Sequence, residues 1–319
     1  MNISNVDLKL NDFVPIVPIL TGHTQTVLGH IVSSEAIKLK LEEKVLSLDD
    51  GDQLLLKYFD NNSGYTISIY HGLAGNSQAD YVRRSASLAA QLVWNIILVD
   101  HRGADQKATS KQTYHSGRGS DAEAVIKWAR NKFINTKHIA LGFSMSGSIL
   151  LNLVTCRYGT EQPDFAVVVN APLDLARSAH LLSVGFSKVY DWRFYLTLKK
   201  IIQSKETIPL PFLARTMDID QLYTSKANGF KDAADYYEKC STLKYIDRIN
   251  TKTFVLAAYD DPFIDIKNYL SANWNGNAHL TFSKYGGHMG YFANKKDPQY
   301  GRRWLDHYLG SVFKKIQTI

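Results

Sequence analysis

Ser144 is the residue whose surroundings point most directly to chemistry. It lies in the segment Gly142-Phe143-Ser144-Met145-Ser146-Gly147, where an apolar run gives way to a helical pattern. A serine on a sharp turn from strand to helix has its hydroxyl lifted above the sheet, and small residues two before and two after it keep strand and helix apart. Gly142 meets this need, and Ser146 stands where a second glycine is usual. The G-x-S-x-S motif therefore predicts a serine nucleophile for acyl transfer.

The same segment has other interpretations. Ser144 could serve only as the N-cap of the following helix, because a serine hydroxyl accepts hydrogen bonds from the first turn. A phosphate-binding loop is excluded, since no Gly-Lys-Ser/Thr follows. No dinucleotide-binding fingerprint occurs here either.

A glycine-bearing loop, His71-Gly72-Leu73-Ala74-Gly75, follows the apolar run 66–70. Acyl transfer needs backbone N–H groups aimed at the oxygen that becomes negative, and losing one such donor costs about a hundredfold to a thousandfold in rate. This is where serine hydrolases of the α/β type keep that loop. We predict that the N–H groups of Leu73 and Met145 form the oxyanion hole, and that His71 shapes the loop. An ordinary glycine-rich turn is the alternative.

Three of the ten histidines lie late enough in the chain to act as the base. In these hydrolases the order along the chain is serine, acid, histidine. His288 lies in a glycine-rich loop directly after a predicted strand, so it is the predicted base. His279 lies within a strand and His307 on the final helix, and both are expected to be structural or surface residues. A solvent-exposed loop histidine is the alternative for His288.

The acid is expected on the loop after the run 253–258, where Asp260 and Asp261 are adjacent. An acid here would orient the imidazole and stabilise its charged form. We assign Asp261, because its place before a proline matches the usual Asp-Pro loop, and we expect Asp260 to cap the turn. Asp265 and Asp100 are more distant alternatives.

The elements that must position these residues follow from the hydrophobic pattern. Short apolar runs alternate with helical patterns, which predicts a mostly parallel sheet covered by helices. The predicted strands are 66–70, 95–100, 137–143, 165–170, 253–258 and 278–282, and the predicted helices are 82–92, 121–130, 146–158 and 302–316. The stretch from about 173 to 245 breaks this rhythm and is expected to be a helical cap inserted over the sheet. Residues 1–319 are expected to form one domain.

Composition narrows the class of protein. With 319 residues, 45% hydrophobic and 21% charged, the chain suits one large α/β domain. The basic residues behind the net charge of +7 are scattered, so a nucleic-acid partner is not expected. Cys156 and Cys240 lie far apart, which predicts neither a disulfide framework nor a thiolate zinc site. Residues 1–7 show no secretory pattern, and the apolar run 13–20 is too short to cross a bilayer. We expect a cytoplasmic protein without stable membrane insertion.

Several segments together resemble the YheT-like branch of the α/β-hydrolases, the abhydrolase type that includes esterases and acylglycerol lipases. The matching segments are Gly22–Thr26, His71–Gly75 with Ser77, Tyr114–Gly117, Gly142–Gly147, Asn170–Asp174, Asp235–Tyr237 with Ser241, Asp260–Phe263 and Gly286–His288. The resemblance implies the α/β-hydrolase fold and a triad of Ser144, Asp261 and His288.

This sequence departs from the family pattern at two places. The usual Leu-Gly-Gly-Asn after the nucleophile reads Met-Ser-Gly-Ser at 145–148, and the Arg-Gly-rich loop reads Asp-His-Arg-Gly-Ala-Asp at 100–105. Both departures leave pocket shape and acyl preference open. The family segments 22–26 and 114–117 have no role that chemistry predicts, and we expect His23 and His115 to pack structurally.

The predicted reaction is hydrolysis of short- to medium-chain carboxylic esters, with monoacylglycerols as candidates, through an acyl-enzyme on Ser144. The expected partner is a small ester or lipid-like molecule, and no metal or organic cofactor is required. The aromatic cluster 186–195 is expected either to line an acyl pocket or to bury the cap. An acyltransferase with the same triad and a non-catalytic binding protein are the alternatives, and a thioesterase or amidase stays open. Haloalkane and epoxide hydrolases are disfavoured, because they use an aspartate at this turn.

Overall fold

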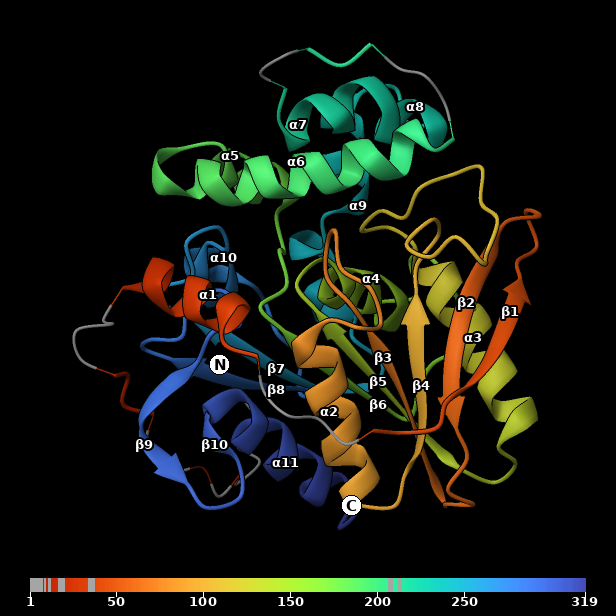
Figure 1. Ribbon diagram of the computed structural model, residues 1–319, viewed down its shortest axis with the longest axis vertical. Helices are drawn as coiled ribbons and strands as arrows, with labels where there is room; N and C mark the ends of the chain where they lie inside the picture. The colour runs from red at the N-terminus through yellow and green to blue at the C-terminus, as the bar shows by residue number, and fades with distance from the viewer. Residues whose placement is uncertain are drawn as a thin grey trace.

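The computed structural model describes residues 8, 10, 13–16, 21–33, 38–205, 209–211 and 214–319. Residues 1–7, which showed no secretory pattern, lie outside the described residues. So do residues 17–20 of the short apolar run 13–20. Figure 1 shows a central twisted sheet with helices on both faces and a further layer of helices beyond one edge.

An eight-stranded sheet forms the centre, in the order β1-β2-β4-β3-β5-β6-β7-β8. Its strands are β1 (Glu42–Ser47), β2 (Gln53–Phe59), β3 (Tyr65–Tyr70), β4 (Asn95–Asp100), β5 (Lys137–Phe143), β6 (Phe165–Val169), β7 (Lys252–Ala258) and β8 (Ala278–Ser283). Strand β2 is antiparallel to both β1 and β4, and every other neighbouring pair is parallel. A separate hairpin pairs β9 (Phe292–Asp297) with β10 (Gly301–Arg303).

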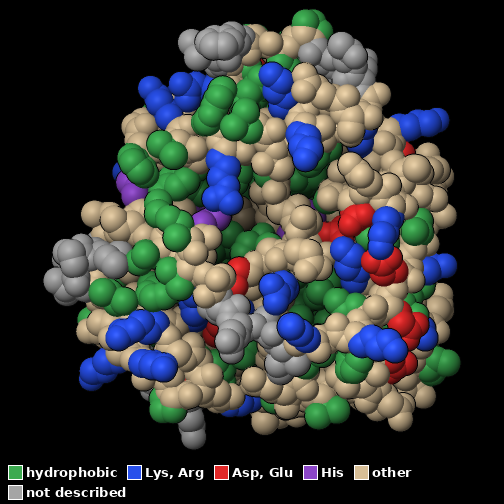
Figure 2. All heavy atoms as spheres, in the orientation of Figure 1, with side chains coloured by type: hydrophobic (Ala, Val, Ile, Leu, Met, Phe, Trp, Pro, Cys, Tyr) green, Lys and Arg blue, Asp and Glu red, His purple; other side chains and the backbone are tan. Residues whose placement is uncertain are grey.

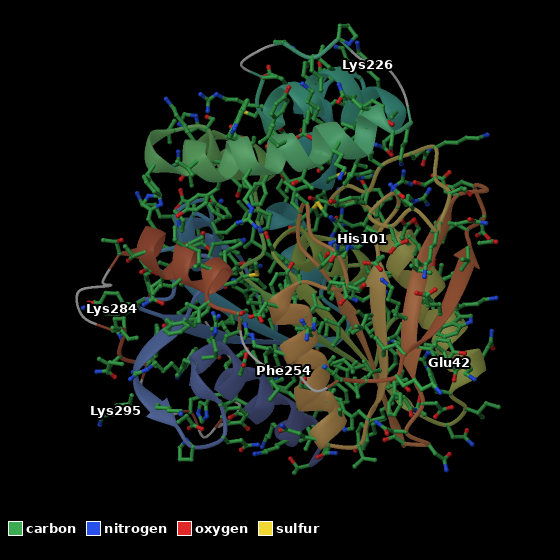
Figure 3. All side chains as sticks on the ribbon, in the orientation of Figure 1. Glu42, His101, Lys226, Phe254, Lys284 and Lys295 are labelled. Carbon is green, nitrogen blue, oxygen red and sulfur yellow. The ribbon has the colours of Figure 1, made fainter. Side chains whose placement is uncertain are left out.

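Both faces of the central strands of this sheet are buried. In β4, Ile96 and Leu98 belong to one core cluster, whereas Ile97 and Val99 belong to the other, as the two-residue period of a strand requires. The first face is covered by α2 (Asp80–Gln91) and α11 (Trp304–Ile316), and the second by α3 (Gly119–Lys132), α4 (Met145–Val154) and α10 (Ile266–Ser271). Figure 3 shows Phe254 of β7 in the interior. Burial on both sides explains why these strands read as continuous apolar runs.

The six predicted strands agree with the structure to within one residue at each end. The helix predicted from 302 begins at Trp304 instead, because Gly301–Arg303 pair with β9. The helix predicted to reach 158 ends at Val154. The sequence patterns did not indicate β1, β2, the β9–β10 hairpin or α1 (Gly22–Ile31).

The chain between β6 and β7 is mainly helical. Its helices are α5 (Leu175–Leu182), η1 (Gly185–Ser187), α6 (Lys188–Gln203), α7 (Thr216–Ile219), η2 (Asp220–Thr224), α8 (Ser225–Ala227), α9 (Ala233–Cys240) and η3 (Leu243–Arg248). Tyr195, Leu198 and Ile202 of α6 form a small core of their own with α7 and η2. In Figure 1, α5 to α8 lie across the top of the view, beyond the sheet. Among the described residues, no helix is long and apolar enough to cross a membrane.

Candidate active site

The residues singled out by the sequence lie on loops that follow parallel strands. Ser144 follows β5, Asp261 lies on the loop after β7, and His288 lies on the loop after β8. Because the carboxyl ends of parallel strands meet at one edge of a sheet, these loops converge. The structure brings all three side chains into one hydrogen-bonded row.

Ser144 occupies a strained turn between β5 and α4. Its φ of 52° and ψ of −122° are unusual for a residue with a Cβ. Gly142 permits the turn, since a Cβ there would lie 2.5 Å from the carbonyl oxygen of Ser146. Ser144 is the N-cap residue of α4, yet its side chain makes no capping hydrogen bond. Its Oγ lies 2.9 Å from Nε2 of His288 instead, so the N-cap alternative does not describe this hydroxyl.

His288 connects the serine to the acid. Its Nδ1 lies 2.8 Å from Oδ2 of Asp261, and its side chain is 2% exposed. An imidazole that donates from Nδ1 to a carboxylate keeps Nε2 free to accept the serine proton. The ring of Phe263 packs against the imidazole with centroids 4.0 Å apart. Both contacts fix the orientation of the ring.

Asp261 is held by several donors at once. Its Oδ1 accepts from the N–H groups of Phe263 and Ile264 at 3.1 Å each, and its Oδ2 accepts from Nδ2 of Asn170 at 2.6 Å as well as from His288. Its neighbour Asp260 instead accepts from the N–H of Gly287 at 2.8 Å, and burial raises the pKa of the Asp260 carboxyl. The structure therefore shows Asp261 bonded to the imidazole of His288, whereas Asp260 is bonded to the backbone of the loop that carries His288, which we call the histidine loop.

The other two carboxylates considered lie away from the imidazole. Asp265 is the N-cap of α10 and pairs with Arg177 at 2.8 Å. Asp100 is buried at the end of β4 and pairs with Lys57 at 2.9 Å.

Asn170 is a site residue for which the sequence predicted no role, although it begins the family segment Asn170–Asp174. It follows β6 directly and has a φ of 49°. Besides donating to Asp261, its amide donates to the carbonyl of Gly287 at 3.2 Å, and its oxygen accepts from the hydroxyl of Tyr291 at 2.8 Å. Asn170 thus joins the acid loop to the histidine loop. Its position just after a parallel strand was the available signal.

Helix α1 gives a role to the Gly22–Thr26 segment. Oγ1 of Thr26 accepts from the N–H of His288 at 2.8 Å and donates to the carbonyl of Gly22 at 2.6 Å. The Gln25 amide bonds both backbone groups of Phe292, donating at 3.2 Å and accepting at 2.6 Å. The segment therefore clamps the histidine loop from the side.

Thr26→Val should lower kcat about tenfold to a hundredfold while KM changes little, because small misplacements of a catalytic group are costly. It also leaves the buried N–H of His288 without an acceptor, which costs about 1–3 kcal/mol of stability. Steady-state kinetics and thermal unfolding measure the two effects. Thr26→Ser keeps the hydroxyl and should restore kcat, and Thr24→Val on the exposed side of α1 is the matched control. Equal kcat values for Thr26→Val and wild type would show that the clamp does not position the imidazole.

Three N–H groups of the loop His71–Gly75 donate to acceptors within the protein. The N–H of Gly72 donates to the hydroxyl of Tyr81, and that of Ala74 donates to the hydroxyl of Tyr114, both at 2.9 Å. The N–H of Gly75 donates to the carbonyl of Gly72 at 3.1 Å.

The N–H of Leu73 has no hydrogen-bond acceptor among the described residues. Met145 is the first residue of α4, so its N–H has no acceptor within the helix. Neither of the two N–H groups predicted for the oxyanion hole therefore has an acceptor in its own loop or helix.

Ser146 differs from the usual glycine, and its hydroxyl has a defined place. It donates to the carbonyl of His71 and lies 2.7 Å from Nε2 of His101. Burial lowers the pKa of the His71 imidazole, and it lowers the pKa of the His101 imidazole well below the ordinary value. Nδ1 of His71 donates to the carbonyl of Gly72 at 2.8 Å, so this ring shapes the loop. The serine thus ties the nucleophile turn to the loop that carries Leu73.

Four histidines that were considered in the sequence besides His71 and His288 lie in packing positions. His279 is buried in β8 beside Phe254, and His307 lies on α11 near Asp297. His115 is buried, and its Nδ1 accepts from the N–H of Gly117 at 3.1 Å. His23 stacks on Tyr190 of α6 with ring centroids 5.9 Å apart. None of these hydrogen bonds or ring contacts joins them to Ser144 within the described part of the chain. No group of three or more His, Cys, Asp or Glu residues there is arranged to hold a metal ion.

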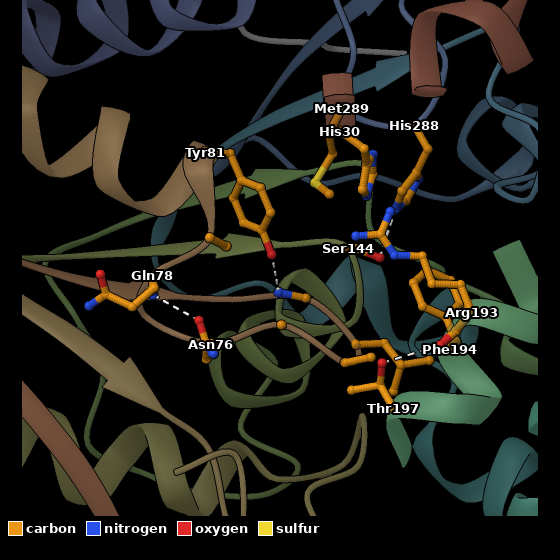
Figure 4. A pocket seen from close by; sticks show the side chains of 15 residues that line it. His30, Asn76, Gln78, Tyr81, Ser144, Arg193, Phe194, Thr197, His288 and Met289 are labelled. Carbon is orange, nitrogen blue, oxygen red and sulfur yellow. Dashed lines mark hydrogen bonds between the residues drawn. The ribbon is translucent and has the colours of Figure 1, made fainter. Parts of the chain in front are cut away.

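Two cavities meet at Ser144. The larger, of about 270 Å³, has both polar and apolar walls, and Figure 4 shows Arg193, Gln78 and Asn76 around it together with His288. The smaller, of about 110 Å³, is mainly apolar and is lined by Leu175, Leu182 and Ile264, with Asp220 at its wall. Leu73 and Phe194 border both. Of the aromatic cluster on α6, Phe194 thus lines the cavities, whereas Tyr195 is buried in the core of the helical segment.

Comparisons with known proteins agree with this architecture. The family described as "alpha/beta hydrolase fold" matches residues 65–164. The esterase Pf2001 of Pyrococcus furiosus has a similar structure, with a TM-score of 0.62 and 16% identity, covering 89% of this chain and 97% of that chain. The chain therefore has the α/β-hydrolase fold, as its sequence predicts.

The relatives found by sequence similarity indicate a narrower group of hydrolases than the shared fold does. YheT of Escherichia coli (strain K12), whose name designates an esterase, is 28% identical over 300 residues, which are 88% of this chain and 87% of that protein. The monoacylglycerol lipase of Saccharomyces cerevisiae (strain ATCC 204508 / S288c) is 28% identical over 259 residues, 75% of this chain and 56% of the lipase. These similarities confirm the predicted resemblance to the YheT-like branch of hydrolases.

Proposed function

We propose that this protein is a serine carboxylesterase that hydrolyses short- to medium-chain esters through an acyl-enzyme on Ser144. The observation that carries the proposal is the row from Ser144 to His288 to Asp261, with contacts of 2.9 and 2.8 Å, beside two N–H groups that have no acceptor in their own loop or helix. Nucleophile, base and orienting acid in hydrogen-bond contact are the arrangement that activates a serine hydroxyl.

The reaction proceeds in two steps. Nε2 of His288 takes the proton of Ser144 as Oγ attacks the ester carbonyl, and the N–H groups of Leu73 and Met145 hold the oxyanion. The tetrahedral intermediate collapses, and the imidazolium returns the proton to the leaving alcohol. Water, deprotonated by His288, then attacks the acyl-enzyme. The bond to Oγ breaks, the acid leaves, and the imidazolium returns the proton to Oγ of Ser144. Asp261 keeps its charge throughout and stabilises the imidazolium.

The two cavities suggest how the ester lies. Leu175, Leu182 and Ile264 suit the acyl chain, and the small volume of their cavity favours short chains. The larger cavity with Arg193, Gln78 and Asn76 suits the alcohol portion. The similarity to a monoacylglycerol lipase supports a glycerol-like alcohol as a candidate.

The domain organisation and location are part of the same proposal. The helical segment between β6 and β7 acts as a cap on a single domain, since Phe194 of α6 and residues of α5 and α7 border the cavities at Ser144. Two free cysteines suit the reducing cytoplasm.

The test is hydrolysis of p-nitrophenyl esters from acetate to palmitate, together with labelling by a fluorophosphonate probe. We expect turnover that is highest for short and medium chains, and mass spectrometry should locate the label on Ser144. Added alcohols should yield little transesterified product, whereas a dominant ester product would favour the acyltransferase alternative. A folded protein that neither turns over any ester nor takes the label would favour the non-catalytic binding protein.

A further inference from the structure

Helix α6 exposes an apolar stripe on its outer side. Val189, Trp192 and Leu196 are 57%, 46% and 47% exposed. Their spacing of three and four residues puts them on one face, and the opposite face buries Tyr195 and Leu198. Exposed Val184 and Phe186 continue the stripe just before the helix.

Basic residues border this stripe. Lys188, Arg193 and Lys200 are all exposed on α6. The one acid of the helix, Asp191, is 1% exposed and pairs with Arg215 at 3.5 Å. In Figure 2 hydrophobic and basic side chains gather over α5 and α6, with no acidic cluster among them. We call the stripe and these three cations the α6 face.

This composition is typical of a helix that lies in the interface of a membrane, with apolar and aromatic side chains among the lipids and cations at the headgroups. A row of large apolar side chains exposed on one helix needs a partner. The three cations and the absence of an exposed carboxylate on α6 select an anionic partner. We propose that the α6 face docks the protein on the surface of an anionic lipid bilayer, lying on it without spanning it.

The docked helix is also a wall of the candidate site. Arg193, Phe194 and Thr197 line the larger cavity together with Ser144. Docking would therefore bring that cavity next to the bilayer, where an amphiphilic ester partitions. This inference goes beyond esterase activity, and vesicle binding tests it separately from hydrolysis.

The experiment is co-sedimentation of the full chain with vesicles of phosphatidylcholine alone or with 30% phosphatidylglycerol. We expect wild type to bind the anionic vesicles and to release at high salt. Trp192→Ser/Leu196→Ser should weaken this binding more than tenfold, because two large apolar side chains no longer leave water. Lys188→Gln/Lys200→Gln should weaken it about fivefold for each lysine and should not affect neutral vesicles.

A matched surface variant and an activity measurement separate loss of membrane binding from a general effect of the substitutions. Ile134, which is 74% exposed on the loop after α3, is a surface residue away from α6, and Ile134→Ser should bind like wild type. Hydrolysis of p-nitrophenyl butyrate in solution should be equal in the Trp192→Ser/Leu196→Ser variant and wild type. If that variant unfolds, Val189→Ser replaces it. The intrinsic fluorescence of wild type should shift to the blue with anionic vesicles, and Trp192→Phe should abolish the shift.

Three results would overturn the proposal. The first is no sedimentation of wild type with anionic vesicles at millimolar lipid. The second is equal binding by wild type and the apolar variants. The third is a wild-type dimer in light scattering that Trp192→Ser/Leu196→Ser converts to a monomer without any vesicle binding, which would assign the α6 face to a second copy of the chain.

Discussion

Ser144→Ala is expected to lower kcat for a short-chain p-nitrophenyl ester by about 10⁶-fold, with KM within a few-fold of wild type. The change removes the atom that forms the acyl-enzyme but leaves the cavities and the N–H groups of Leu73 and Met145. Residual hydrolysis, with water as the direct nucleophile, should still exceed the uncatalysed rate by about 10³-fold to 10⁴-fold. The fluorophosphonate label should disappear completely. Initial rates at saturating ester and mass spectrometry of the labelled protein measure both effects.

The backbone conformation at Ser144 determines the expected effect of Ser144→Ala on stability. Alanine at a φ of 52° is as strained as serine, so the thermal midpoint should stay within a few degrees of wild type. Ser120→Ala on the exposed start of α3 is the matched substitution and should leave kcat unchanged. Retention of more than about 1% of activity by Ser144→Ala, after titration of the site excludes contaminating wild type, would mean that another residue is the nucleophile.

The parts of the site that the sequence predicted are those whose signal is local. The turn at Ser144 is predictable because Gly142 and the change from strand to helix stand within a few residues of it. The apolar runs predicted six strands because burial on both faces leaves little room for polar residues. Strand β1 gave no such signal, since its residues Glu42–Ser47 are mostly exposed at the edge of the sheet and half of them are charged.

The unpredicted parts depend on contacts between distant segments. Thr26 and His288 are 262 positions apart, and no local pattern shows that one accepts a hydrogen bond from the other. The same holds for Asn170 and Asp261, 91 positions apart. Ser146 looked like a small departure from a glycine, but its partners are the carbonyl of His71 and the ring of His101. Such roles follow only once the strand order has brought the loops together.

Asp261→Asn is expected to lower kcat by about 10⁴-fold. An asparagine that presents its NH₂ group to the imidazole would stabilise the tautomer with the proton on Nε2, and that nitrogen could no longer accept the proton of Ser144. The donors from Asn170, Phe263 and Ile264 would remain, one of them facing the new amide nitrogen. Steady-state kinetics at neutral pH measures the loss, and the fluorophosphonate labelling rate should fall in parallel because both depend on the activated serine.

Asp260→Asn makes the decisive comparison, because the two acids are adjacent and the substitution is the same. Its amide oxygen still accepts from the N–H of Gly287, so kcat should stay within about tenfold of wild type. Burial raises the pKa of the Asp260 carboxyl, which means that folding disfavours its charge, and a neutral asparagine should not lower the thermal midpoint at neutral pH. A larger kcat loss in Asp260→Asn than in Asp261→Asn would reverse the assignment. The imidazole would then take its orientation from the backbone of its loop rather than from the carboxylate 2.8 Å from Nδ1.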